Sequence, residues 1–299
     1  MSAELLRKRL DACAQETAKA LEELLPPERD PARLLNESMR YSLLAGGKRL
    51  RAFLTLTFCE LCGGKRADAL HYAAGLEMMH AFSLIHDDLP EMDNDTIRRG
   101  KPTNHMVYGS ATALLAGDAL ALKAVETVAL NPRVSPERNL LAVRILSSQA
   151  GYEGMCGGQQ IDLQSEHEVI PRDVLEQLVD RKTGALFAAA CMLGCISGPD
   201  DPDAFLGSAS RFGRLTGLAF QIADDLLDLH ATAEELGKTP GKDLASEKST
   251  FPALLGEEEA KNYAASLCRE AKKLLDGFPD SEPKSALVQY CEFILSRQN

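Results

Sequence analysis

Hydrophobic residues recur at helical spacing along most of the chain, and no stretch alternates apolar and polar residues as a half-buried strand does. Prolines and glycines interrupt the pattern and mark the ends of the segments. The pattern therefore predicts an all-α fold. The predicted helices span residues 2–25, 31–45, 50–62, 66–89, 107–130, 136–155, 172–197, 202–232, 251–275 and 282–297.

The composition is that of an ordinary globular chain. Of its 299 residues, 45% are hydrophobic, 26% are charged and 5% are aromatic. Abundant alanine and leucine favour helices, because these side chains lose little rotamer freedom there. No linker-like or low-complexity segment divides the chain, which predicts a single domain over residues 1–299.

The first residues of the chain and the length of its apolar segments indicate where in the cell the protein is expected. Residues 1–10 mix both charges and lack the apolar core of a signal peptide. No apolar stretch reaches the roughly 20 residues that a membrane span requires. The sequence therefore predicts a cytoplasmic protein with no membrane span.

Net charge and cysteine usage narrow the classes of partner. A net charge of −11 makes nucleic acid a poor partner, although a small polyanion could bind through local cations or divalent metal ions. Cys59 and Cys62 form a CxxC, but no second pair or nearby histidine pair completes a metal set. We interpret the eight cysteines as reduced packing residues.

The first acidic motif runs from Asp87 to Asp93 and follows an apolar helical segment. Pro90 cannot continue that helix, so the carboxylates gather at its C-terminal end. The helix dipole disfavours acids at this end. Metal cations would offset that cost, and Mg²⁺ typically takes one or two carboxylates together with substrate phosphates.

The second acidic motif, Asp224-Asp225-Leu-Leu-Asp228, also follows an apolar segment. Asp224 and Asp228 are one turn apart on one helix face, whereas Asp225 is rotated by about 100°. A single acidic pair is more often solvated surface, but two such motifs on apolar helices predict a shared metal site. His86-Asp87 also suggests an HD-type phosphohydrolase, which six histidines in the whole chain make improbable.

Basic segments accompany the acidic motifs and could bind phosphate oxygens. A solvated surface patch is the competing interpretation of any one of them. Gly237-Lys238-Thr239 lacks the spacing of a Walker A motif. The basic segments are Gly46–Arg51, Arg98–Lys101, Arg181–Gly184, Gly237–Lys242 and Lys248–Thr250.

The string Ser83–Asp93, the segment Arg98–Thr103 and Asp224–Asp228 resemble the trans-isoprenyl diphosphate synthases, most closely the bacterial farnesyl diphosphate synthases. The resemblance extends from Gly46 to Leu255 and includes Gly157-Gly158-Gln159. It implies an all-helical fold around a central cavity, a homodimer, and two or three Mg²⁺ ions as cofactor.

The resemblance also assigns roles by position. Mg²⁺ ligands would be Asp87, Asp93 and Asp224, with Asp88 and Asp228 in support. The allylic diphosphate would be held by Arg98, Lys182, Lys238 and Lys248. Isopentenyl diphosphate would be held by Lys48, Arg51, His80 and Arg99, with Arg297 as a further candidate. Thr183 and Gln221 would face the developing allylic cation.

The implied reaction condenses isopentenyl diphosphate with dimethylallyl or geranyl diphosphate to give farnesyl diphosphate. Cations would stabilise the departing diphosphate, and an apolar helical barrel would shield the carbocation from water. The alternatives are a geranylgeranyl diphosphate synthase, a class I terpene cyclase and a non-catalytic synthase subunit. A cyclase needs no isopentenyl diphosphate site, and a non-catalytic subunit could dispense with the acidic motifs.

Product length depends on the helix before Asp87. Phe82 lies five residues upstream, about 7.5 Å along the axis, where an aromatic ring could close the cavity and Ser83 could not. By resemblance this arrangement implies a fifteen-carbon product, whereas an ordinary core position is the competing interpretation of Phe82. Glu91 and Asn94 depart from the family pattern, and Glu91 would add a charge beside the metal ions.

Overall fold

The computed structural model describes residues 3–27, 31–199, 203–230 and 249–296, and nearly all of its regular structure is helical. The predicted all-α fold is confirmed. The helices are α1 (Ala3–Leu24), α2 (Arg33–Leu43), α3 (Leu50–Leu61), α4 (Arg66–Asp87), α5 (Asn104–Tyr108), α6 (Ser110–Ala129), α7 (Pro136–Ala150), α8 (Met155–Gln164), α9 (Arg172–Val179), α10 (Ala185–Ser197), α11 (Asp203–His230), α14 (Phe251–Leu255), α15 (Glu257–Leu274) and α16 (Glu282–Ser296). A 3₁₀ turn, η2 (Leu275–Gly277), follows α15.

Three differences from the predicted elements concern glycine-rich or polar segments. α8 was not predicted as a helix, because its glycines weaken helix propensity and only packing holds it. The segment predicted as one helix over 172–197 contains a π-helical turn, η1 (Asp180–Gly184), between α9 and α10. Gly109 and Gly256, both at positive φ, divide two other predicted helices.

A short hairpin joins α4 to α5, although no strand was predicted. β1 (Ile97–Arg98) pairs antiparallel with β2 (Lys101–Pro102). The two turn residues, Arg99 and Gly100, have φ values of 54° and 72°. Positive φ at both positions is the geometry of a type I′ turn, which tightens the hairpin that carries Arg98 and Arg99.

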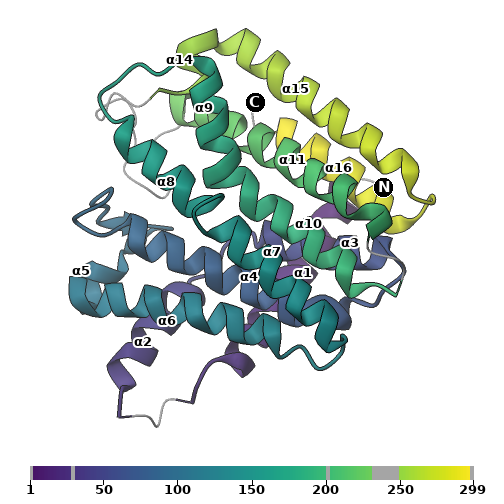
Figure 1. Cartoon of the computed structure of the whole chain (residues 1–299). Helices are drawn as coiled ribbons and strands as arrows, with labels where there is room; N and C mark the ends of the chain where they lie inside the picture. Colours follow the sequence, from purple (N-terminus) through teal and green to yellow (C-terminus); the bar gives the residue numbers. More distant parts are fainter. Residues whose placement is uncertain (1–2, 28–30, 200–202, 231–248, 297–299) are drawn as a thin grey trace.

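Helices α3, α4, α10 and α11 form the centre of the molecule, where α10 packs against its neighbour α11 and against the sequence-distant α3 and α4. α15 and α2 lie at opposite sides of it (Figure 1). Close approach depends on small residues: a Cβ at Gly213 of α11 would lie 2.5 Å from Ala188 Cα of α10. Phe58 of α3 meets Phe212 of α11 edge-on at 5.3 Å. One continuous hydrophobic core thus unites the described helices.

Large apolar side chains are exposed at several places on the surface. None of the described helices has both the length and the apolar composition needed to cross a membrane. Large apolar side chains are exposed on α5 and α6, among them Met106, Leu115 and Leu122.

Candidate active site

A cavity of about 580 Å³ lies between α3, α4, α9, η1 and α11, and we call it the central cavity. It brings together both acidic motifs and most of the predicted basic residues. The predicted residues that line it are Lys48, Arg51, His80, Asp87, Asp93, Arg98, Arg99, Lys182, Thr183, Gln221, Asp224 and Asp228. Lys238, Lys248 and Arg297 lie outside the described residues.

The first acidic motif folds back on the end of α4. The backbone N–H of Asp93 donates to the Asp87 carbonyl at 2.9 Å, and that of Asn94 donates to the Leu89 carbonyl at 3.0 Å. Asn94 adopts φ 50°, a left-handed conformation that asparagine and aspartate tolerate better than most residues. This bend places Asp93 next to Asp87. Glu91 is exposed and is not among the residues that line the central cavity, and its predicted charge beside the metal ions stays a prediction.

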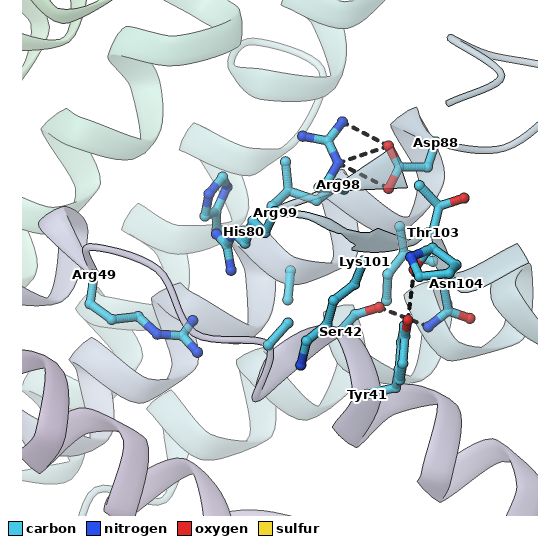
Figure 2. Close-up of a pocket in the computed structure, with 15 residues that line it drawn as sticks. Tyr41, Ser42, Arg49, His80, Asp88, Arg98, Arg99, Lys101, Thr103 and Asn104 are labelled. Carbon is cyan, nitrogen blue, oxygen red and sulfur yellow. Dashed lines mark hydrogen bonds and ion pairs between the residues drawn. The ribbon is translucent and has the colours of Figure 1, made fainter. Parts of the chain in front are cut away.

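Asp88 stands behind the central cavity and pairs with Arg98. Arg98 Nε lies 2.8 and 2.9 Å from the two carboxylate oxygens, and Nη2 lies 2.7 Å from Oδ1. Figure 2 shows the Arg98 guanidinium directed at the Asp88 carboxylate. Asp88 is only 3% exposed, so its function here is to hold Arg98 at the cavity edge. The sequence did not reveal this pairing.

All three carboxylates of the second acidic motif, Asp224, Asp225 and Asp228, line the central cavity, although helical spacing set Asp225 apart from the other two. The buried Asp225 accepts hydrogen bonds from Gln221 Nε2 at 2.9 Å and from the backbone N–H of Phe251 at 3.3 Å. Thr183 Oγ1 donates to Gln221 Oε1 at 3.2 Å. Asp225 therefore orients Gln221 and ties α14 to α11.

The π-helical turn η1 directs Lys182 into the cavity. Lys182 Nζ lies 2.5 Å from Asp162 Oδ2 of α8. α8 approaches this turn so closely that a Cβ at Gly158 would lie 2.2 Å from the Lys182 backbone nitrogen. π-helical turns often occur at functional sites. Sequence reasoning missed Asp162, although it lies three residues after Gln159 and thus on the same side of α8.

The basic side of the cavity centres on Arg51. Its guanidinium lies 4.8 Å from the centre of the Phe187 ring, and its Nε has no hydrogen-bond partner among the described residues. Lys48 Nζ lies 5.8 Å from the Phe293 ring centre. Arg51 and Lys48 thus extend from the start of α3 towards the space where a phosphate could bind.

Arg49, between these two cations, has a structural function that the sequence did not reveal. It forms a buried ion pair with Glu77 at 2.9 Å and also donates to the Leu43 carbonyl. The Arg99 guanidinium donates to the Gly46 carbonyl. These contacts fix the loop before α3 against α4 and the hairpin.

His80 and His86 lie in different surroundings. Burial and the nearby arginines, Arg51 foremost, hold the pKa of His80 well below its usual value, so the ring is neutral. His86 Nε2 lies 3.0 Å from the Leu114 carbonyl of α6. His86 therefore faces α6 and not the acidic motifs, which argues against an HD-type phosphohydrolase.

Burial changes the pKa of a carboxylate that lines the central cavity. It raises the pKa of Asp87 from 3.8 to about 6, although Lys182 opposes this and Asp93 adds to it. Within the described residues, no three His, Cys, Asp or Glu side chains form a ready-made metal cluster. Mg²⁺ usually takes few protein carboxylates and completes its shell with phosphate and water. Carboxylates from two helices facing one cavity fit that requirement.

A second cavity of about 360 Å³ lies between α4 and α8 and shares Arg51, His80, Leu84, Asp87, Lys182 and Thr183 with the central cavity. Along α4 it runs from His80 to Asp87, and both Phe82 and Ser83 line it. The Phe82 ring packs edge-on against His86 at 4.8 Å. Its other lining residues are Met92, Met155, Cys156, Gln159, Gln160 and Leu163.

All eight cysteines are free thiols, and seven of them are buried. Burial raises the pKa of Cys59 to about 12. This agrees with the interpretation of reduced packing residues, except that Cys156 is exposed and lines the second cavity.

Comparison with known proteins identifies the family. A family model described as "Polyprenyl synthetase" matches residues 32–288. The chain belongs to the polyprenyl synthetase family. A geranylgeranyl pyrophosphate synthase of Capsicum annuum is 46% identical over 268 residues, which cover 89% of this chain and 72% of that relative. A heterodimeric geranylgeranyl pyrophosphate synthase large subunit of Arabidopsis thaliana is 43% identical over 99% of this chain and 78% of its own length.

Solved structures of polyprenyl synthetases agree with the fold. An FPP/GFPP synthase from Zymomonas mobilis matches with a TM-score of 0.87 and 36% identity over 98% of this chain and 100% of that one. A geranyltransferase from Helicobacter pylori, complexed with magnesium and isoprenyl diphosphate, matches with a TM-score of 0.82 and 30% identity over 99% and 98%. The resemblance to the trans-isoprenyl diphosphate synthases is thereby confirmed. The chain is a prenyltransferase of this family.

Proposed function

We propose that this polyprenyl synthetase condenses isopentenyl diphosphate with dimethylallyl or geranyl diphosphate and releases farnesyl diphosphate. The observation that carries the product length is the second cavity, which extends along α4 only from His80 to Asp87 and has the Phe82 ring in its wall. That span is about 10 Å at helical rise, which favours a short product chain.

We assign the residue roles by their positions in the two cavities. Asp87, Asp93 and Asp224 would hold two or three Mg²⁺ ions, with Asp228 in support. Asp88 acts through Arg98, which it positions. When bound, the metal ions supply positive charge to the departing diphosphate.

The basic residues divide between two substrates. Lys182 and Arg98 bind the allylic diphosphate beside the acidic motifs. Lys48, Arg51 and Arg99 bind isopentenyl diphosphate on the opposite side, where the neutral ring of His80 can donate one hydrogen bond. This second basic group favours chain elongation over cyclisation, because a cyclase has no second diphosphate to hold.

The Thr183 and Gln221 side chains face the reacting carbons. Their oxygen dipoles stabilise the allylic cation as the diphosphate leaves. The double bond of isopentenyl diphosphate then attacks this cation, and a proton is lost to the departed diphosphate. The apolar residues that line the second cavity exclude water that would otherwise capture the cation.

A second candidate product is geranylgeranyl diphosphate. The names of the Capsicum annuum and Arabidopsis thaliana relatives support it and favour it over the fifteen-carbon product. The position of Phe82 supports the shorter product. The two candidates share one mechanism and differ only in the number of condensations.

The deciding experiment incubates the purified chain with Mg²⁺, isopentenyl diphosphate and either dimethylallyl or geranyl diphosphate, and measures product length by chromatography. We expect mainly the fifteen-carbon product, and a mainly twenty-carbon product would establish the second candidate. Asp87→Asn and Asp224→Asn should each lower turnover by about 10²-fold or more. No condensation with either starter, or normal rates in both variants, would refute the proposal.

We also propose a homodimer. The resemblance implies it, and the exposed apolar side chains of α5 and α6 supply a suitable surface. The cytoplasmic location stays a prediction, since the names of several relatives place them in chloroplasts.

A further inference from the structure

Gln159 lines the second cavity, and its amide has no hydrogen-bond partner among the described residues. Its side chain lies on α8 and is 9% exposed. Neither Nε2 nor Oε1 has a hydrogen-bond partner among the described residues. Well over nine-tenths of buried polar groups in proteins are paired, and each unpaired one costs about 1–3 kcal/mol. The folded protein therefore carries the free-energy cost of the unpaired Gln159 amide at the edge of the proposed reaction site.

The surroundings of Gln159 indicate what kind of molecule would pair with it. The second cavity is lined by the charged side chains of Asp87 and Lys182 and by the apolar side chains of Phe82, Met155 and Leu163. A ligand that satisfies both kinds of side chain has an anionic head and a hydrocarbon tail. The tail cannot form hydrogen bonds, so the partner of the amide belongs to the head.

The backbone of α8 places Gln159 beside Lys182. The preceding residue, Gly158, lies so close to the Lys182 backbone that even a Cβ would collide with it. Asp162, one turn further along α8, holds Lys182 Nζ at 2.5 Å. Gln159 is therefore carried by the same rigid contact that positions Lys182 and Thr183.

We propose that Gln159 is a further catalytic residue that contacts the allylic substrate where its diphosphate meets its first carbons. The amide N–H groups donate to the diphosphate, and the carbonyl oxygen faces the carbons that become positive. This inference rests on the proposed prenyl transfer and adds to it a contact from α8. Both contacts strengthen as the bond to the diphosphate breaks, so they act on the rate of ionisation.

The test replaces the amide with an apolar group of similar size, Gln159→Leu. We expect kcat/KM for geranyl diphosphate to fall about 10- to 100-fold, the loss typical of one or two hydrogen bonds to a charged group. The fall should lie mostly in kcat, and KM for isopentenyl diphosphate should stay within about twofold, because Lys48 and Arg99, assigned to that substrate, line the central cavity and not the second one.

Thermal unfolding distinguishes a substrate contact from a structural residue. Because Gln159→Leu removes a buried unpaired amide, the melting temperature without substrate should stay the same or rise. The matched control is Gln164→Leu, an exposed glutamine at the end of α8 that lines neither cavity, and it should change neither activity nor stability.

The outcomes separate this inference from the proposed function. A wild-type chain that fails to condense the substrates refutes the proposed function. An active wild-type chain whose Gln159→Leu variant keeps its kcat, or loses activity only in proportion to a lowered melting temperature, refutes the assignment of Gln159 alone.

Discussion

At the scale of single residues, carboxylates only a few positions apart have different functions because their environments differ. Asp88 is buried against Arg98, whereas Asp225 lines the central cavity and accepts hydrogen bonds from Gln221 and from the start of α14. Asp87 also lines the central cavity, and burial raises its pKa to about 6. Its charge therefore destabilises the metal-free protein, and bound cations would relieve that cost.

The cost of the Asp87 charge can be measured. Because its folded pKa lies above the ordinary 3.8, the neutral carboxyl contributes stability that is present below about pH 4 and is lost as pH rises through about 6. Metal-free Asp87→Asn should thus be more stable than wild type at pH 8, by about 1–3 kcal/mol, and this difference should shrink towards pH 4. Thermal unfolding in a chelator at several pH values checks it.

A suitable control is Asp276→Asn, which changes an exposed carboxylate remote from both cavities. It should leave the melting temperature within a degree or so at every pH. Equal stability of Asp87→Asn and wild type at pH 8 would contradict the buried charge inferred for Asp87.

At the scale of elements, the contact between α8 and η1 determines where Lys182 and Thr183 lie. Gly158 makes this contact possible, since it has no side chain between the two backbones. Asp180 contributes from the start of η1 by pairing with Arg214 of α11 at 2.5 Å. Both α8 and α11 therefore hold the π-helical turn in place.

Gly158→Ala should disturb this contact directly. Its new Cβ would lie 2.2 Å from the Lys182 backbone nitrogen, so α8 or η1 must move. We expect a loss of about 1–3 kcal/mol in stability, as for other overpacked sites, and a marked loss of turnover. Chemical denaturation and the condensation assay measure the two effects.

Gly207→Ala provides the matched control on α11, because no atom outside its own helix lies within 4 Å of the added Cβ. Replacing a helical glycine by alanine there should stabilise the protein by about 0.5–1 kcal/mol and leave turnover unchanged. If Gly158→Ala behaved like Gly207→Ala, the close contact would not be needed for positioning Lys182.

At the scale of the whole molecule, two cavities meet at six shared residues, Arg51, His80, Leu84, Asp87, Lys182 and Thr183. The central cavity is polar and joins elements from α3 to α14, whereas the second cavity is bounded by α4 and α8. The reacting carbons would lie where the two join. The second cavity would then determine product length, and the central cavity would bind the diphosphates and the metal ions.

Phe82→Ala should enlarge the second cavity and lengthen the product by at least one five-carbon unit. Removing a ring from the cavity wall leaves space that a growing chain can fill. Chromatography of the products, with isopentenyl diphosphate in excess, measures the change. Tyr152→Ala removes an aromatic side chain that is 87% exposed and lines neither cavity, so it should leave the product unchanged. An unaltered product profile in Phe82→Ala would assign Phe82 to ordinary packing.

Much of this architecture could be predicted from local patterns. Helical periodicity located most of the long helices, and Pro90 located the end of α4 to within a few residues. The pairing of Asp224 with Asp228 on one face followed from their spacing. α8 and the hairpin escaped prediction because glycines and short strands carry little local signal.

The sequence by itself determined the helical fold, the two acidic motifs and the family, because each depends on spacing along one element. Tertiary structure decided what the neighbours of those motifs do. It pairs Arg49 with Glu77, Arg98 with Asp88 and Lys182 with Asp162. It also leaves the amide of Gln159, at the second cavity, without a hydrogen-bond partner among the described residues. The physical reason is that ion pairs, burial and cavities join residues distant in sequence, and only the packing of helices brings those residues together.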